Sequence, residues 1–132
     1  MNMAQPLKIL VVDDNEASAK TMGWMLDLLG HQTRLAFDGP SAITAAHEFQ
    51  PNVVMLDIGL PVMNGYDACS LMKRDPQLKN TIFIAQTGWG QQEHRDRSKE
   101  AGFDYHLVKP VRLEQLQEIL VSIARQQPAL VD

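Results

Sequence analysis

The chain has 132 residues, 45% of them hydrophobic, which is enough for one hydrophobic core. Its 12 basic and 16 acidic residues give a net charge of −4, so neither a clustered basic surface nor direct binding to nucleic acid is expected. One cysteine excludes an internal disulfide, and no apolar run approaches the roughly 20 residues of a membrane span. We expect one cytoplasmic domain over residues 1–132, with a core at about 7–125 and a frayed or linking tail at 126–132.

Short apolar runs alternate five times with longer stretches of helical period. In chain order, these patterns predict a strand at 7–12, a helix at 15–29, a strand at 32–37, a helix at 41–49, a strand at 52–58, a helix at 66–74, a strand at 81–86, a helix at 91–101, a strand at 105–108 and an amphipathic helix from Leu113 to Ile123. Trp24 is expected on the apolar face of the first helix. The helix at 91–101 has almost no apolar face, which suits a surface that shifts easily.

The alternation predicts an α/β fold with a doubly wound, five-stranded parallel sheet. Polar groups stand where four of the strands end: Asp13 and Asp14, then Asp57, Thr87 and Lys109. In the strand order 3-2-1-4-5, the third strand would lie roughly 10 Å from the first. In the order 2-1-3-4-5 all these groups share one crevice, so we predict that order, in a flavodoxin-like three-layer sandwich.

Three carboxylates in one crevice repel one another, each pair by on the order of 4 kcal/mol at about 4 Å and an effective dielectric near 20. A hard divalent cation with oxygen ligands relieves this repulsion, and Mg²⁺ suits one or two carboxylates plus water. Lys109 adds a positive charge, while Thr87 and the Gly88 amide add hydrogen-bond donors. This set predicts a cradle for a phosphoryl group, with a carboxylate as the nucleophile.

Four segments together resemble the receiver domain of two-component response regulators. They are Val11–Asn15, Leu56–Gly65, Ala85–Gly88 and Val108–Pro110, and the resemblance covers nearly the whole chain. It implies that Asp57 takes a phosphoryl group from a phosphohistidine. It also implies a cis peptide bond between Lys109 and Pro110, and a protein that works as a switch and not as a turnover enzyme.

The same resemblance implies a role for each remaining site residue. Asp14 would bind Mg²⁺ (or Mn²⁺) directly and Asp13 largely through water, with Asp57 and the Gly59 backbone carbonyl completing the protein ligands. Thr87 would turn toward the new phosphoryl oxygens, and Lys109 would pair with them. His106 stands where these domains usually carry a tyrosine or phenylalanine that changes rotamer, so Thr87 and His106 are the candidate switch pair.

The implied partners are a histidine kinase or a histidine phosphotransfer protein, and a downstream protein that the sequence does not identify. The phosphorylated state would act on a surface made by the helix at 91–101, the strand at 105–108 and the last helix, and this state can also form a homodimer. Segments 87–91 and 103–110 are most similar to receivers fused to hybrid histidine kinases. No membrane partner is expected.

Three alternatives stay open at the level of sequence. A haloacid dehalogenase-type phosphatase also uses Asp, Thr or Ser, and Lys, but its nucleophile strand carries Asp-x-Asp, and here the residue two after Asp57 is Gly59. A second alternative is an interaction module that works without phosphorylation. As a third, Asp13 and Asp14 could serve only as a cap for the first helix.

Overall fold

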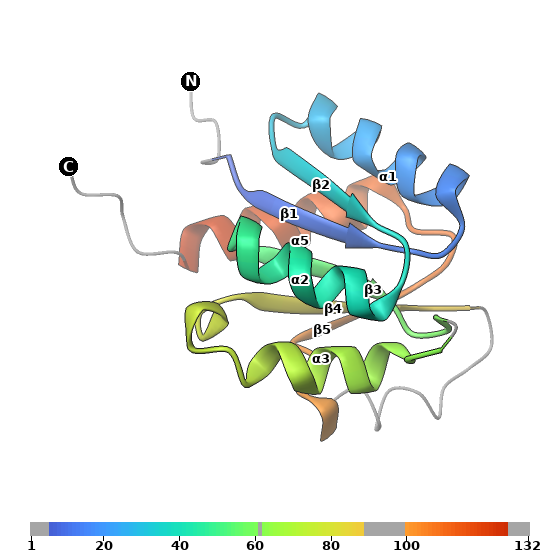
Figure 1. The fold of residues 1–132 in the computed structure, drawn as a ribbon. Helices are drawn as coiled ribbons and strands as arrows, with labels where there is room; N and C mark the ends of the chain where they lie inside the picture. Colours follow the sequence, from blue (N-terminus) through green and yellow to red (C-terminus); the bar gives the residue numbers. More distant parts are fainter. Residues whose placement is uncertain (1–5, 61, 89–99, 127–132) are drawn as a thin grey trace.

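The computed structural model describes residues 6–60, 62–88 and 100–126, in which strands and helices alternate along the chain (Figure 1). In chain order, the elements are β1 (Lys8–Val12), α1 (Glu16–Leu28), β2 (Gln32–Ala36), α2 (Gly39–Phe49), β3 (Val53–Asp57), α3 (Gly65–Lys73), the 3₁₀ turn η1 (Pro76–Leu78), β4 (Ile82–Thr87), β5 (Tyr105–Val108) and α5 (Leu113–Gln126). This order confirms the predicted alternation of strands and helices from β1 to β4.

The five strands form one parallel sheet in the order β2-β1-β3-β4-β5. Parallel neighbours need a crossover connection, and α1, α2 and α3 supply three of these crossovers. The observed order is the predicted 2-1-3-4-5. It places β1 and β3 side by side, so the groups that follow them in the chain emerge at the same edge of the sheet.

The central strands β1, β3 and β4 are buried on both faces, and successive residues point to opposite sides of the sheet. Ile9 and Val11 of β1 belong to a core that packs against α1 and α5. Leu10 and Val12 belong to a second core, which packs against α2 and α3. Figure 1 shows these helices on the two sides of the sheet. The result is the predicted three-layer sandwich.

Most predicted boundaries are accurate to one residue. The largest differences are at α5, which continues to Gln126 and not only to Ile123, and at α2, which begins at Gly39 and not at residue 41. The 3₁₀ turn η1 lies in a segment that the sequence predicts as a loop. The predicted helix at 91–101 lies outside the described residues apart from its last two residues, and so does the predicted tail beyond residue 126.

Side-chain caps fix where three helices begin. The residue before each of α1, α2 and α3 accepts a hydrogen bond from the backbone amide three residues later, and these caps are Asn15, Asp38 and Asn64. Hydrogen bonds from Ser41 lower the pKa of Asp38. Because Asn15 follows the acidic pair and Asn64 closes the loop after β3, two of these caps also fix the backbone beside the predicted site.

Two large apolar side chains of α1 lie on the surface. Trp24 is 66% exposed and Leu28 is 87% exposed. The prediction for Trp24 is therefore wrong: α1 buries Ala19, Met22 and Leu26, and a turn of 100° per residue carries position 24 away from that face.

Across residues 6–60, 62–88 and 100–126, no helix combines the length and the apolar character that a bilayer span requires.

Candidate functional site

The predicted site residues come together at the carboxyl edge of the sheet. Asp57 is the last residue of β3, and Thr87 is the last residue of β4. Asp13 directly follows β1, and Lys109 directly follows β5. Because these four strands are contiguous, their ends line one edge, as the order 2-1-3-4-5 predicts.

Asp13, Asp14 and Asp57 form a compact acidic cluster. One carboxylate oxygen from each residue lies within 4.8 Å of the others. The environments differ, since Asp13 is 4% exposed, Asp57 is half-buried and Asp14 is exposed. Like charges at about 4 Å repel by about 4 kcal/mol at an effective dielectric near 20, so this cluster requires a compensating positive charge.

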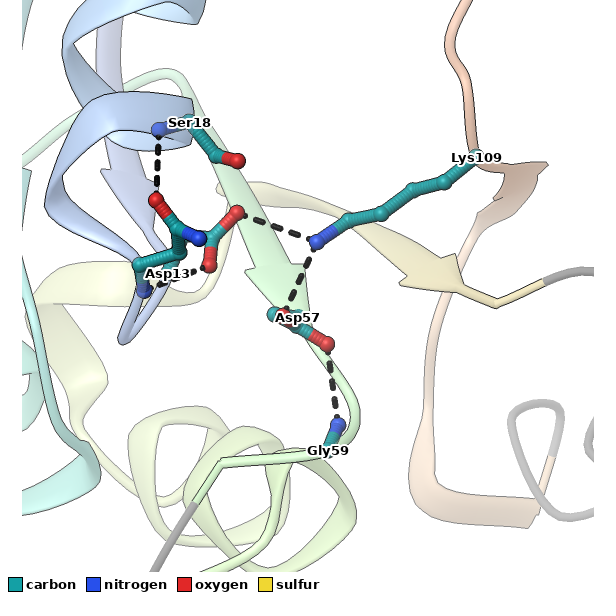
Figure 2. Close-up of polar contacts among 6 residues, drawn as sticks. Asp13, Ser18, Asp57, Gly59 and Lys109 are labelled. Carbon is teal, nitrogen blue, oxygen red and sulfur yellow. Dashed lines mark hydrogen bonds and ion pairs between the residues drawn. The ribbon is translucent and has the colours of Figure 1, made fainter.

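Lys109 supplies part of that compensation. Its Nζ donates to Oδ2 of Asp13 and to Oδ2 of Asp57, both at 3.0 Å (Figure 2). Burial lowers the pKa of the Lys109 ammonium, but its hydrogen bonds to Asp57 and Asp13 and the charges of both carboxylates outweigh that effect and raise the pKa above its usual value. The ammonium therefore stays charged at neutral pH and bridges two carboxylates from different strands.

Backbone amides hold the second oxygen of each bridged carboxylate. The Asn15 amide donates to Oδ1 of Asp13 at 3.0 Å. The Gly59 amide donates to Oδ1 of Asp57 at 2.9 Å (Figure 2). Each carboxylate is thus oriented from two sides. The helix-cap alternative for the acidic pair is wrong, because Asn15 caps α1 by accepting from the Ser18 amide at 3.0 Å.

The Thr87 hydroxyl points to the neighbouring strand. Thr87 Oγ1 and His106 Nε2 lie 2.8 Å apart, and Thr87 is only 2% exposed. The two residues predicted as a switch pair are therefore in direct contact. The predicted cis peptide bond between Lys109 and Pro110 is also present.

The loop between β3 and α3 closes tightly against the carboxylate-bearing residue. The Gly65 amide donates to the Ile58 carbonyl at 3.0 Å. A Cβ at position 65 would lie 2.7 Å from the Asp57 carbonyl oxygen, so this approach requires glycine. Neither this role of Gly65 nor the capping role of Asn15 follows from the sequence patterns. The Asn-Gly pair at 64–65 just before a helical stretch was the available signal.

The donor set suits a hard divalent cation. Each carboxylate oxygen has two lone pairs, so one hydrogen bond from Lys109 or an amide leaves acceptor capacity on the same atom. Asp14 adds an exposed carboxylate to the cluster. All three ligand groups are oxygen donors, which Mg²⁺ and Mn²⁺ prefer over nitrogen and sulfur. The residues present therefore fit the predicted ion.

Comparison with known protein families shows which class of protein carries this site. The response regulator receiver domain matches residues 9–121. The chain belongs to this family. The match includes the acidic cluster, Thr87 and Lys109, so this receiver carries its polar site inside the part that defines the family.

Individual relatives are similar to this receiver over most of its length. The polar-differentiation response regulator DivK of Brucella anthropi is 26% identical over 117 residues, which cover 89% of this chain and 95% of DivK. Hybrid signal transduction histidine kinase G of Dictyostelium discoideum is 35% identical over 119 residues, which cover 88% of this chain but only 4% of the kinase.

A solved structure shows the same fold around a metal ion. It is the receiver domain of the sensor histidine kinase PA1611 from Pseudomonas aeruginosa PAO1, with a magnesium ion coordinated in its active-site cleft. It is 29% identical, with a TM-score of 0.84, and the match covers 92% of this chain and 100% of that domain.

The protein is therefore a receiver domain of two-component signalling, and its acidic cluster fits a phosphoacceptor site. Receivers are signalling phosphoacceptors that interact with histidine kinases or phosphotransfer proteins, and in general they are not turnover enzymes. Family membership removes the haloacid dehalogenase-type phosphatase from the alternatives.

Proposed function

We propose that Asp57 is the residue of this receiver that accepts the phosphoryl group. The observation that carries the proposal is the Lys109 ammonium, which lies 3.0 Å from Oδ2 of both Asp57 and Asp13. The bridge places a permanent positive charge where the phosphoryl oxygens would arrive. The Asp57 side chain is 15% exposed, so a donor can reach it, and Gly59 holds its other oxygen.

In the proposed reaction, a carboxylate oxygen of Asp57 attacks the phosphorus of a phosphohistidine in line with the leaving nitrogen. The oxygen–phosphorus bond forms as the phosphorus–nitrogen bond breaks, and the donor imidazole keeps the electron pair. Lys109 neutralises charge on the carboxylate and on the transferred oxygens. The product is an acyl phosphate on the chain itself, so the protein acts as a switch and not as a turnover enzyme.

Asp13, Asp14 and Asp57 would hold Mg²⁺ or Mn²⁺, and the Gly59 carbonyl would join them as a ligand. The 4.8 Å limit on their separation supports this assignment. When bound, the ion supplies positive charge that offsets the three carboxylates and the phosphoryl group. Asp13 and Asp57 have to share their oxygens between the ion and Lys109, and their backbone hydrogen bonds keep them oriented while they do so.

Thr87 and His106 would report the phosphorylated state. The Thr87 hydroxyl would leave His106 Nε2, its present partner at 2.8 Å, and turn to a phosphoryl oxygen. The change would bias the surface that includes β5 and α5 toward a downstream protein or a second copy of the phosphorylated chain. The donor would be a histidine kinase or phosphotransfer protein, and we place the receiver in the cytoplasm, where ATP-dependent kinases act.

The test is incubation with acetyl phosphate and Mg²⁺, followed by intact-protein mass spectrometry. We expect a gain of one phosphoryl group in the native chain and none in Asp57→Asn. Asp67→Asn, an exposed aspartate on α3, serves as the matched control and should still gain it. An unmodified native chain would favour an interaction module that works without phosphorylation.

A further inference from the structure

A cavity lies between α1 and the segment that follows β5. Its volume is about 610 Å³, within the range of about 300–1,000 Å³ that is usual for small-molecule sites. Its apolar lining consists of Val11, Ala17, Met22, Met25, Pro110 and Val111. The cavity therefore has the size and the largely apolar walls of a ligand site.

The charges that line this cavity are balanced. The two charged lining residues are Asp13 and Lys109, and they form an ion pair with Nζ and Oδ2 3.0 Å apart. Ser18 and Thr21 add hydroxyl groups, but both residues are exposed, so water can satisfy them. An occupant with a net charge of either sign gains little from such a lining, and a neutral occupant fits it best.

One more polar residue, Gln86 of β4, lines the cavity and is only 3% exposed. It lies two residues after Ile84 and so on the same face of the strand, and Ile84 belongs to the core that packs against α1 and α5. Within the part of the chain that the structure describes, the side-chain amide of Gln86 has no hydrogen-bond partner. This buried amide thus faces the cavity without a partner in the fold.

The fold gains no stability from an amide at position 86. A buried polar group that lacks a partner lowers stability, whereas an apolar side chain of similar size does not. The three residues before it in β4, Phe83, Ile84 and Ala85, are all buried and apolar. A buried unpaired group of this kind calls for an explanation, and a ligand that pairs with the amide supplies one.

We propose that this cavity binds a small neutral ligand with an apolar body and a primary amide, and that Gln86 recognises the amide. A primary amide places an N–H donor beside a carbonyl acceptor, so it pairs with the carboxamide of Gln86 through two hydrogen bonds. The apolar body would contact Met22 and Met25, whose unbranched side chains adapt to different shapes. The inference does not rest on the proposed function of Asp57.

The test titrates four compounds that share a benzene ring into the full chain. Benzamide is the neutral amide, acetophenone keeps the carbonyl but has no N–H donor, benzoate is an anion and benzamidinium is a cation. Nuclear magnetic resonance follows the side-chain amide of Gln86 and the methyl groups of Met22 and Met25. We expect benzamide to bind with a dissociation constant on the order of 1 mM, and each of the others about fivefold more weakly.

Gln86→Leu removes the amide and keeps an apolar side chain of similar size. We expect benzamide to bind about tenfold more weakly to this variant, because two hydrogen bonds are lost. The melting temperature should rise, since an unpaired buried amide is gone. Gln115→Leu makes the same change at an exposed position of α5, and it should alter neither quantity.

The results that would overturn the proposal are distinct. Equal binding of benzamide and acetophenone, or undiminished binding of benzamide to Gln86→Leu, would remove Gln86 from recognition. Tighter binding of benzoate or benzamidinium would reject a neutral ligand. A lower melting temperature in Gln86→Leu would show that the amide stabilises the fold. Binding of none of the four would mean that only water meets the amide. None of these measurements involves phosphorylation, so their failure leaves Asp57 as the proposed acceptor.

Discussion

The Thr87 hydroxyl and the His106 imidazole are hydrogen-bonded partners, with Oγ1 and Nε2 2.8 Å apart. The bond links Thr87, the last residue of β4, to His106, the second residue of β5. Since Thr87 is only 2% exposed, water cannot readily replace its partner. A tyrosine or phenylalanine, the usual residue at this position in similar domains, has no ring nitrogen, so a bond of this kind is tied to the histidine.

This pairing predicts a measurable coupling energy. His106→Phe leaves the buried Thr87 hydroxyl without its partner, which should lower the free energy of unfolding by about 1–2 kcal/mol. In Thr87→Val the hydroxyl is absent, so a subsequent His106→Phe should cost less. Urea unfolding of the two single variants and the double variant forms a double-mutant cycle, with an expected coupling of about 1 kcal/mol. Additive effects would show that the bond contributes nothing.

Removal of the Lys109 charge should strengthen the binding of Mg²⁺ but slow the phosphorylation of Asp57. In Lys109→Met the acidic cluster loses its bridging ammonium, so Mg²⁺ should bind more tightly, by about tenfold, because less positive charge opposes it. Labelling by acetyl phosphate should slow by about a hundredfold, as when one preorganised electrostatic donor is removed. Calorimetry of Mg²⁺ binding and intact mass measure the two effects.

Lys79→Met is the control for that experiment, because Lys79 is exposed beside η1. Both properties should match those of the native chain. If Lys109→Met bound Mg²⁺ more weakly, the ammonium would have to organise the carboxylates for the metal instead of competing with it, and the electrostatic account of the site would be wrong.

Metal removal should lower the stability of the folded state. A ligand present at about 100 times its dissociation constant stabilises a protein by about 2.7 kcal/mol, so Mg²⁺ should raise the melting temperature relative to EDTA. Asp13→Asn should lose most of this difference, because one of the three clustered carboxylates is gone. Asp67→Asn should keep it. An equal response in all three proteins would place the ion elsewhere.

Hydrophobic pattern and strand ends were enough to predict the architecture and the cluster. The apolar runs at 7–12 and 52–58 contain β1 and β3, which are buried on both faces and so show no alternation. Of the two doubly wound orders 3-2-1-4-5 and 2-1-3-4-5, only the second brings Asp13, Asp57 and Lys109 together. In the structure, Lys109 Nζ lies 3.0 Å from Oδ2 of both Asp13 and Asp57.

The features that sequence reasoning missed depend on local geometry. Trp24 was misplaced because an apolar residue in an amphipathic helix does not have to lie on the buried face. Gly65 owes its role to how one loop closes against Asp57, and no periodicity encodes that closure. In the sequence, Asn15 and the two aspartates before it are all residue types that cap helices. Only the hydrogen bond from the Ser18 amide identifies Asn15 as the cap of α1.

The close approach of Gly65 to Asp57 predicts that alanine destabilises the fold at position 65 but not at position 88. Gly65→Ala places a Cβ 2.7 Å from the Asp57 carbonyl oxygen and 2.8 Å from Ile58 Cα, and backbone cannot move aside cheaply. We expect a loss of about 1–3 kcal/mol in the free energy of unfolding, together with slower labelling of the displaced Asp57. Gly88→Ala, whose Cβ would meet no atom within 4 Å, should be close to neutral in stability.

His31 should make the stability of this receiver depend on pH. Its Nδ1 accepts a hydrogen bond from the Leu7 amide at 3.0 Å, which requires that nitrogen to be unprotonated. Burial lowers the pKa of His31 below its usual value of 6.5. The unfolded chain therefore binds more protons at this residue than the folded chain does, so the contribution is complete above pH 6.5 and is lost as pH falls through the lower, folded pKa.

Unfolding in urea at a series of pH values between about 5.5 and 8 tests this prediction. The chain has three other histidines, so the informative quantity is the difference between the native chain and His31→Gln, which keeps an acceptor but does not titrate. The native chain should lose more stability than His31→Gln as the pH falls. Parallel curves would mean that His31 is protonated equally in the folded and unfolded chains, which its hydrogen bond to Leu7 does not allow.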